Sequence, residues 1–500
     1  MRILTCLILL HGVLSFNFLK KLFFKNNIIN NDNYFLKDNF EPVFEEKTII
    51  VENKCSKMRK LEGFFGQIGS NPKYISEEDQ YHWFDGNGMI HGVFFNNTNI
   101  VYRNHWVRTT RYNVEDHFKR KIYLYLGELK GLKGMMKIIA SELLFVLDLI
   151  PKVQGRANTA FLNWNNKVYS LQEGDLPYEV NIDFENKNIE TIGQLKLENI
   201  TSVTAHPEVD NLSKELYLYG YNTDDLSKGI FYNNVFDDKF NLLKRKNYSM
   251  INNCMIHDIS QTENYLVIPD LPLNFDIKNI INNKLPLQFD KNSTSRIGLL
   301  DKRTDKMEWF IFDNNFYIFH FVKSFEIDNK IIIYACVFDE VYMEDFVDLH
   351  DEKYVRGNPA LKKIIIDKET KNTEIIDNVF LNDKTILGFP YYIEFPIESE
   401  DGKTLYGSVF DRNTAQIIGI IKIDIDEFET NIPNFMLLED KYICSEPKVV
   451  KIEEKEYLLA FTYDKNTSYI SLFDIDNKKT HSINLNTRIP PGFHTIMLNK

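Results

Sequence analysis

The chain has 500 residues, of which 44% are hydrophobic and 26% are charged, a composition typical of a globular protein with enough apolar material for a core. Its formal net charge of −12 and the lack of a dominant basic stripe argue against nucleic acid as a partner. Aromatic residues make up 14% of the chain, which fits a β-rich core, an aromatic-lined apolar tunnel, or both.

The N-terminal segment differs from the rest. MRILTCLILLHGVLS has one early arginine and then an apolar run ending in small residues, as a secretory signal does, but it is too short to span a bilayer. The next stretch, FNFLKKLFFKNNIINN, is basic and free of acids. This pair is similar to the two-part plastid address of algae with secondary plastids; the alternative is a leader without an import role on a cytoplasmic, membrane-associated protein. We therefore assign residues 1–55 to a partly disordered leader and 56–500 to a single domain.

Short strand-like stretches recur through this domain. KVYSLQEG, ELYLYGYN, KIIIYACVF and SYISLFDID are examples, each rich in Ile, Val, Tyr or Phe and bounded by turn residues. No low-complexity linker divides them. The pattern favours a closed or radially repeated all-β architecture such as a propeller, although no internal sequence repeat is visible.

One segment interrupts the β pattern. Residues 126–150, LGELKGLKGMMKIIASELLFVLDLI, have a helical composition, with lysines at three- and four-residue spacing among Met and Ile. The spacing predicts an amphipathic helical insertion. Such a helix could rest on a membrane surface, or it could pack on the body of the domain.

Four histidines lie in short apolar or aromatic runs that are far apart in the sequence. The runs are TAHPEVD, CMIHDIS, FYIFHFV and PPGFHTI, which contain His206, His257, His320 and His494. Neutral imidazole is the usual protein ligand for a first-row transition metal. Ligands so scattered cannot form a local loop site, so they predict a metal only in a fold that brings distant strands to one axis.

At these residues the chain resembles the carotenoid cleavage dioxygenases, a family that includes retinoid isomerohydrolase and stilbene-cleaving enzymes. The resemblance covers roughly residues 60 to 500 and is closest to plant enzymes that cut carotenoids at the 9,10 and 9′,10′ double bonds. The matching stretches include HWFDGNGMIHG (82–92), WVRTTRY (106–112), GRANTAFLNWNNKVYSLQEGDLPYEV (155–180), TAHPEVD (204–210), MIHDISQTENYLVIPDLP (255–272) and RIPPGFH (488–494).

The resemblance implies a seven-bladed β-propeller with a helical cap over one face. It also implies a non-haem Fe(II) on the propeller axis, held by the four histidines, and no catalytic residue beyond that iron site. Three carboxylates would accept the outer ring N–H of the ligands and fix their tautomer; on the matching motifs SLQEG, YIEFP and CSEPK these are Glu173, Glu394 and Glu446.

One residue departs from the family pattern, which usually reads His-x-x-Asn after the third histidine. Here the fourth position is Lys323. Its side chain should either point outward to solvent or accompany a change of packing beneath the cap, which puts the position of the substrate in doubt more than catalysis.

The resemblance implies oxidative cleavage of a C=C bond of a carotenoid or apocarotenoid by O2 to two carbonyl products, at the 9,10 and/or 9′,10′ bonds. Because a carotenoid is almost insoluble in water, we expect peripheral membrane association through the helix at 126–150. Two alternatives stay open: stilbene-type cleavage on the same iron site, and a catalytically silent carotenoid-binding propeller.

Overall fold

The computed structural model describes residues 32–76, 79–152, 155–222, 228–347, 355–381 and 387–500. Regular structure in these ranges is mostly antiparallel β-strand, which confirms the all-β class. The first 31 residues lie outside the described residues, so the leader predicted there stays a prediction. The division of the chain near residue 55 also stays a prediction, although the strand at 48–52 already pairs within the first sheet.

The first sheet joins the two ends of the described chain. Its order is β1-β4-β3-β2-β33, with β1 (Thr48–Glu52), β4 (Asn99–Trp106), β3 (Gly88–Phe95), β2 (Gly63–Ser70) and β33 (Thr495–Leu498). The last strand therefore pairs beside β2, with Phe64 opposite Leu498. This pairing fixes the position of the segment that directly precedes β33.

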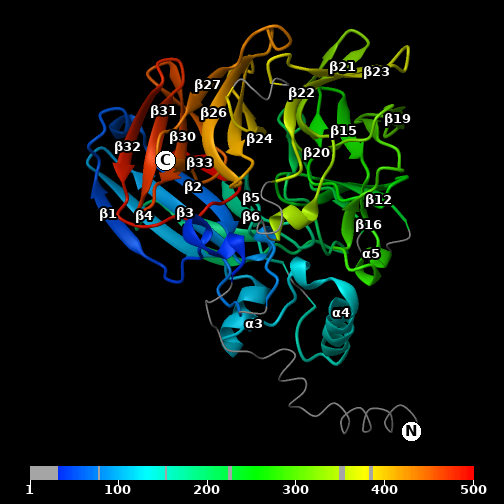
Figure 1. The fold of residues 1–500 in the computed structure, drawn as a ribbon, viewed down its shortest axis with the longest axis horizontal. Coiled ribbons are helices and arrows are strands. Elements are labelled where there is room, and N and C mark those ends of the chain that lie inside the picture. Colours follow the sequence, from blue (N-terminus) through cyan, green and yellow to red (C-terminus); the bar gives the residue numbers. More distant parts are fainter. Residues whose placement is uncertain (1–31, 77–78, 153–154, 223–227, 348–354, 382–386) are drawn as a thin grey trace.

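The other sheets follow one another along the chain (Figure 1). One contains β5 (Ala160–Trp164), β6 (Lys167–Leu171), β7 (Tyr178–Asp183) and β8 (Asn188–Gln194). The next contains β9 (Glu208–Asp210), β10 (Glu215–Tyr217), β11 (Gly220–Tyr221), β12 (Ile230–Phe236) and β13 (Leu242–Ser249). A third contains β14 (Ser260–Gln261), β15 (Tyr265–Asp270), β18 (Arg296–Asp301) and β19 (Met307–Ile311), beside the hairpin of β16 (Leu273–Phe275) and β17 (Leu287–Phe289).

The C-terminal half continues this pattern. One sheet contains β20 (Tyr317–Ile327), β21 (Lys330–Phe338), β22 (Ala360–Asp367) and β23 (Thr373–Asp377). The largest contains β24 (Tyr391–Glu398), β25 (Thr404–Asp411), β26 (Gln416–Asp424), β27 (Asn434–Leu437), β28 (Tyr442–Ile443), β29 (Lys448–Ile452), β30 (Lys455–Tyr463), β31 (Ser468–Asp474) and β32 (Lys479–Asn484). None of these sheets closes into a ring within the described ranges.

Strand β21 carries apolar residues on both faces because its sheet packs against other parts of the protein on both sides. In β21, Ile331 and Ile333 belong to one core cluster, while Ile332 and Tyr334 belong to another. Successive side chains of a strand point to opposite faces, so a strand buried on both faces reads as a continuous apolar run rather than an alternating one. The stretch KIIIYACVF has this form for that reason.

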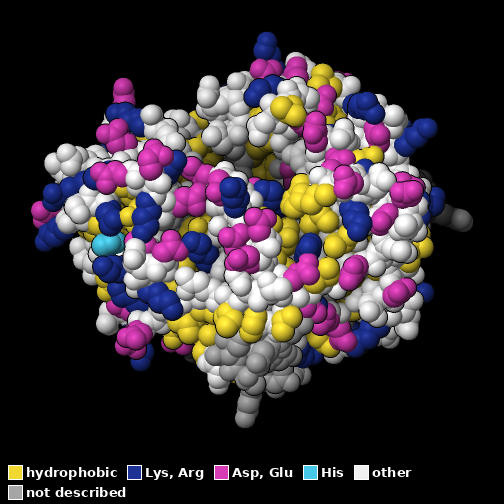
Figure 2. All heavy atoms as spheres, turned by 90° about the horizontal axis from the view of Figure 1, so that it is seen from above, with side chains coloured by type: hydrophobic (Ala, Val, Ile, Leu, Met, Phe, Trp, Pro, Cys, Tyr) yellow, Lys and Arg dark blue, Asp and Glu magenta, His cyan; other side chains and the backbone are white. Residues whose placement is uncertain are grey.

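Helices are few and gather on one side of the strands. Figure 1 shows α3 and α4 together below the sheets. The α-helices are α3 (Thr110–Phe118), α4 (Gly131–Val146) and α5 (Ile277–Ile281), and the short 3-10 turns are Tyr34–Leu36, Asp38–Phe40, Met58–Lys60, Trp83–Asp85, Leu126–Glu128 and Met343–Phe346. Among the described residues, no helix has both the length and the apolarity needed to cross a bilayer. On the side away from α3 and α4, Figure 2 shows positive and negative side chains interspersed.

The helix expected within residues 126–150 is present as α4 and the turn before it, which confirms the predicted helical insertion. One ion pair holds α4 to this turn: Lys137 places Nζ 2.6 Å from a carboxylate oxygen of the buried Glu128, whose other oxygen lies 2.6 Å from Nζ of Lys121. One face of the helix is apolar and exposed, at Leu132, Met136, Ile139, Leu143 and Val146. Its other face turns toward a cavity in the body of the protein.

Candidate metal centre

Four separate sheets bring the four predicted histidines together. His206 and His257 lie just before β9 and β14, His320 lies within β20, and His494 directly precedes β33. One nitrogen of each ring lies within 4.8 Å of those of the other three. We call these four residues the histidine cluster. No local loop could produce it, because each ring comes from a different sheet.

Three of the rings turn one nitrogen outward to a carboxylate. Nδ1 of His320 lies 2.5 Å from Glu394 and Nδ1 of His494 lies 3.4 Å from Glu446. His257 contacts Glu173 through Nδ1 in the same way. Each glutamate named from the sequence therefore touches one ring of the cluster. His206 has no such carboxylate contact in the part of the chain that the structure describes.

The opposite nitrogens point to a shared centre. Nε2 of His320 and Nε2 of His494 lie 3.2 Å apart, although two ring nitrogens gain little from facing each other unless a cation lies between them. Nε2 of His206 is buried without a hydrogen-bond partner. A buried polar atom without a partner is costly, and such an atom at the centre of a cluster indicates a ligand. The residues present therefore fit a transition metal ion.

Burial keeps two of these rings neutral. Burial lowers the pKa of His206 and of His320 well below the usual range, and the neighbouring rings lower both further. A neutral ring offers a lone pair to a metal, whereas an imidazolium offers none. His206 and His320 are therefore nitrogen donors at neutral pH.

The three carboxylates differ in their surroundings. Burial opposes ionisation of Glu173 and Glu446, but the histidines beside them bring each pKa below its ordinary value. Burial raises the pKa of Glu394 to about 8, since this residue is only 7% exposed. A divalent cation on the rings would lower that value.

Irregularities in the strands aim some of these side chains. The pairing of β20 with β21 shifts register across His320, between Ile318 and Phe321, and again just after it, between Phe321 and Lys323. A second shift in β24 follows Glu394, where Phe395 has a positive φ of 50°. Bulges of this kind re-aim side chains beside functional sites. The sequence gives no sign of either bulge, because each depends on the partner strand.

The histidine cluster opens on a cavity of about 460 Å³ that is lined by His257, His320 and His494. One side, which we call the apolar wall, belongs to or packs on a single core cluster and consists of Met255, Phe275, Leu287, Phe319, Phe338 and Met343. The face of α4 that turns toward the cavity contributes Ile138, Ser141, Glu142 and Phe145. None of these lining residues could be recognised from the sequence as part of a site, because they come from many separate elements.

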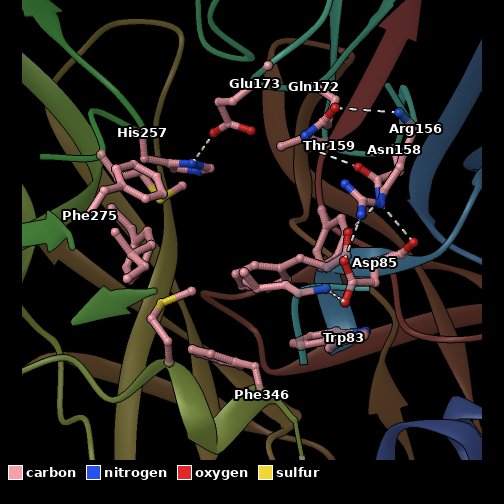
Figure 3. A pocket seen from close by; sticks show the side chains of 18 of the residues that line it. Trp83, Asp85, Arg156, Asn158, Thr159, Gln172, Glu173, His257, Phe275 and Phe346 are labelled. Carbon is pink, nitrogen blue, oxygen red and sulfur yellow. Dashed lines mark hydrogen bonds and ion pairs between the residues drawn. The ribbon is translucent and has the colours of Figure 1, made fainter. Parts of the chain in front are cut away.

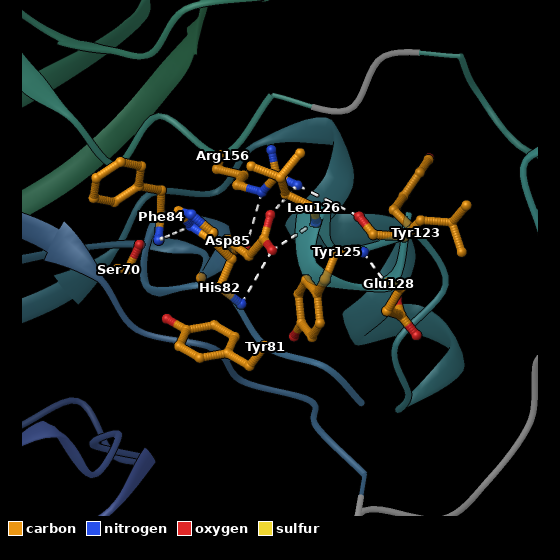
Figure 4. A network of polar contacts seen from close by, with 12 residues as sticks. Ser70, Tyr81, His82, Phe84, Asp85, Tyr123, Tyr125, Leu126, Glu128 and Arg156 are labelled. Carbon is orange, nitrogen blue, oxygen red and sulfur yellow. Dashed lines mark hydrogen bonds and ion pairs between the residues drawn. The ribbon is translucent and has the colours of Figure 1, made fainter. Parts of the chain in front are cut away.

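Across the cavity from Phe275 lies a polar wall, which we define as Asp85, Arg156, Asn158, Thr159 and Gln172 (Figure 3). Arg156 donates from Nη2 to Oδ1 of Asp85 and from Nε to the Asp85 backbone oxygen, both at 2.9 Å. The other carboxylate oxygen of Asp85 accepts the backbone N–H of Leu126 at 2.6 Å. Figure 4 shows how this network joins the Trp83–Asp85 turn to the turn before α4.

Lys323 takes no part in the cavity. Its Nζ lies 2.8 Å from the backbone oxygen of Gly402 and 3.0 Å from Glu398, between β20 and the turn after β24. The side chain therefore ends in protein contacts and is only 27% exposed, rather than extending into solvent. It is not among the residues that line the cavity.

Comparisons with known proteins identify the class. A model of the Retinal pigment epithelial membrane protein family matches residues 59–496, so the chain belongs to this family. Carotenoid 9,10(9′,10′)-cleavage dioxygenase 1 of Pisum sativum is 29% identical, over 96% of this chain and 92% of that protein. The protein of the same name from Arabidopsis thaliana is 27% identical, over 93% and 90%. The family match and these relatives confirm the family predicted from the sequence. They also confirm the expectation that the chain is an oxygenase enzyme.

Solved structures show the same fold. Cobalt-substituted Synechocystis apocarotenoid oxygenase (ACO) aligns with a TM-score of 0.74 at 18% identity, over 92% of this chain and 97% of that chain. Pseudomonas brassicacearum lignostilbene dioxygenase aligns with a TM-score of 0.75 at 17% identity, over 94% and 99%. At such low identity these likenesses concern the fold alone.

Proposed function

We propose that this protein is a non-haem iron dioxygenase that cleaves a C=C double bond of a carotenoid or apocarotenoid with O2, giving two carbonyl products. The observation that carries the proposal is the histidine cluster, four imidazole side chains that converge beside a largely apolar cavity. The names of the relatives supply the substrate class, and their 9,10(9′,10′) bonds are the ones we propose for this chain.

The residues of the chain would divide the work as follows. Iron bound by the cluster would supply the activation of O2. The apolar wall would hold the polyene by shape, since a hydrocarbon has no charge to bind, and would exclude water from the reacting bond. Glu173, Glu394 and Glu446 would fix the orientation of the rings they touch.

We also propose that the architecture is a seven-bladed propeller capped by α3 and α4. The supporting observation is strand order: if the largest sheet is divided between β27 and β28, seven antiparallel units follow one another along the chain, apart from the small β16–β17 hairpin. The pairing of β33 beside β2 would then complete the unit that joins both ends of the chain.

Membrane association is a further part of this proposal. The exposed face of α4 presents Leu132 at 77% and Val146 at 79% exposure, and Ile277 and Ile281 of the contacting helix α5 are also exposed. An apolar helix face of this kind can lie in the headgroup region of a bilayer, from which a water-insoluble substrate would be drawn.

The test is anaerobic loading of the purified protein with Fe(II), followed by O2 and separate incubations with β-carotene, an apocarotenal and a hydroxystilbene. Two carbonyl products from a carotenoid or apocarotenoid, with matching O2 consumption, would support the proposal. Cleavage of the hydroxystilbene alone would replace it with the stilbene-type reaction. Recovery of unaltered pigment without O2 consumption would leave a silent binding protein.

A further inference from the structure

We infer that the polar wall binds an oxygen atom at one end of the substrate, so that the preferred substrate is a polyene with a terminal carbonyl, an apocarotenal, rather than a hydrocarbon carotene. This inference rests on the proposed function and makes it more specific. A carotene offers no hydrogen-bond acceptor, yet the cavity presents polar groups opposite its apolar wall (Figure 3).

Arg156 is the charged hydrogen-bond donor of the polar wall. Its Nε and Nη2 are used by Asp85 and, at 3.4 Å, by the backbone oxygen of Leu124. Nη1 has no hydrogen-bond acceptor among the described residues, and it is not enclosed by protein atoms, since it is absent from the buried atoms without partners. The guanidinium is therefore half engaged: one edge is held by Asp85, and Nη1 is left without an acceptor in a side chain that lines the cavity.

Gln172 adds a second donor on the same wall. Its Oε1 accepts the backbone N–H of Arg156 at 3.4 Å, which directs the amide nitrogen away from that contact. The part of the chain that the structure describes gives this nitrogen no acceptor. Thr159 uses its hydroxyl to donate to Asn158, so it does not compete for the same acceptor. The wall therefore offers N–H donors from two side chains.

The charges favour a neutral acceptor. Asp85 is 2% exposed and compensates the charge of Arg156, so the pair carries no net charge for an anion to neutralise. A carbonyl oxygen accepts two hydrogen bonds and donates none, which matches a site that offers donors alone. Hydrogen bonds to charged groups are among the stronger ones in proteins, and a dry cavity strengthens them.

The arrangement also orients the substrate. With its carbonyl end at Arg156, the hydrocarbon part of the polyene would extend past the histidine cluster toward Phe275 and the rest of the apolar wall. A terminal aldehyde on a polyene is itself the product of oxidative cleavage of a C=C bond. The substrate would then come from an earlier cleavage of a longer carotenoid.

The test compares matched polyenes that differ only at one end: an aldehyde, the corresponding alcohol and a methyl-terminated hydrocarbon. Arg156→Lys keeps a cation beside Asp85 but removes the second edge of the guanidinium. We expect the ratio of kcat/KM for the aldehyde to that for the hydrocarbon to fall about tenfold or more, the usual effect of one hydrogen bond to a charged group. Gln172→Met, which removes no charge, should lower the ratio by a smaller factor.

The matched control is Arg296→Lys. Arg296 also pairs with a buried aspartate, Asp270, at 2.7 Å, but it does not line the cavity. The Arg296→Lys variant should keep the wild-type ratio of kcat/KM for the aldehyde to that for the hydrocarbon.

A second readout needs no turnover: the absorption band of a conjugated aldehyde shifts to longer wavelength when its oxygen accepts a hydrogen bond. Anaerobically bound aldehyde should show this shift in the wild type and lose most of it in Arg156→Lys.

The outcomes separate the two proposals. If the wild-type protein cleaves aldehyde and hydrocarbon equally well, or if Arg156→Lys and Arg296→Lys give the same ratio and spectrum, the inference about the polar wall is wrong while the proposed function stands. If no carotenoid or apocarotenoid is cleaved by the iron-loaded wild type, the proposed function itself fails.

Discussion

The histidine cluster and helix α4 both border one cavity, yet they are built in opposite ways. The cluster is held within or just before the edge strands of four sheets, β9, β14, β20 and β33, and His320 and His494 are buried. Helix α4 contacts the body through its inner face and through the ion pair between Lys137 and Glu128, while its outer face is apolar and exposed.

This contrast separates two requirements of one reaction. Groups that hold a metal must keep their geometry within fractions of an ångström, and a framework of paired strands provides this rigidity. Groups that admit an insoluble substrate need apolar surface rather than fixed geometry, and a single amphipathic helix provides it. Substitutions in the two regions should therefore affect different measurements.

The largest effect is expected in the cluster. His320→Ala removes one of four metal donors and leaves Glu394 buried without its ring partner. We expect iron content after anaerobic loading to fall to a small fraction of the wild-type value, and cleavage to fall below detection. Metal analysis measures the iron content, and product chromatography measures cleavage. His481→Ala in β32, outside the cavity lining, is the control and should keep both. Full activity of His320→Ala would refute the metal role of the cluster.

The next effect tests the carboxylates around the rings. Replacing a carboxylate that orients a metal-bound histidine typically weakens metal affinity about 10- to 100-fold. Glu394 lies 2.5 Å from its ring and Glu446 lies 3.4 Å from its own, so Glu394→Gln should weaken iron binding more than Glu446→Gln. Competition with a chelator measures both affinities. Equal affinities in the two variants and the wild type would show that these contacts do not tune the metal.

Parts of this site could be predicted from the sequence, and parts could not. The strand composition and the four histidines are local signals, and the motifs around Glu173, Glu394 and Glu446 resemble those of a known family. The bulges beside His320 and Glu394 could not be predicted, because a register shift depends on which strands pair.

The cavity could not be predicted from the sequence either. Its polar wall depends on the pairing of Arg156 with Asp85, which is 71 residues away in the chain. No periodicity or composition signals such a contact, and the motifs FDG and GRANTA gave no reason to join the two side chains. The position of the Lys323 side chain could not be predicted from the sequence either. Its contacts with Glu398 and Gly402 place it outside the cavity.

A smaller effect, confined to α4, tests access rather than chemistry. Replacing both Met136 and Ile139, which are 49% and 63% exposed, with glutamate puts two charges on the apolar face. The fold should remain, but recovery with lipid vesicles in a flotation assay should fall several-fold, because burying a charge in the apolar part of a bilayer is costly. Leu212→Glu places a charge at a comparably exposed leucine outside α4 and should float like the wild type. Unchanged flotation of the α4 variant would rule out this face as the docking surface.

The smallest effect is expected at Lys323, where the resemblance leads one to expect asparagine. Its partners are the backbone oxygen of Gly402 and the carboxylate of Glu398, whose side chain is 42% exposed. A partly exposed ion pair contributes less than about 1 kcal/mol, so Lys323→Asn should shift the unfolding midpoint only slightly. Iron content and the preference among carotenoids should stay as in the wild type, because the lysine does not line the cavity. A changed product pattern in this variant would mean that packing beneath the helices responds to residue 323, and that the cavity and the β20–β24 contact are coupled.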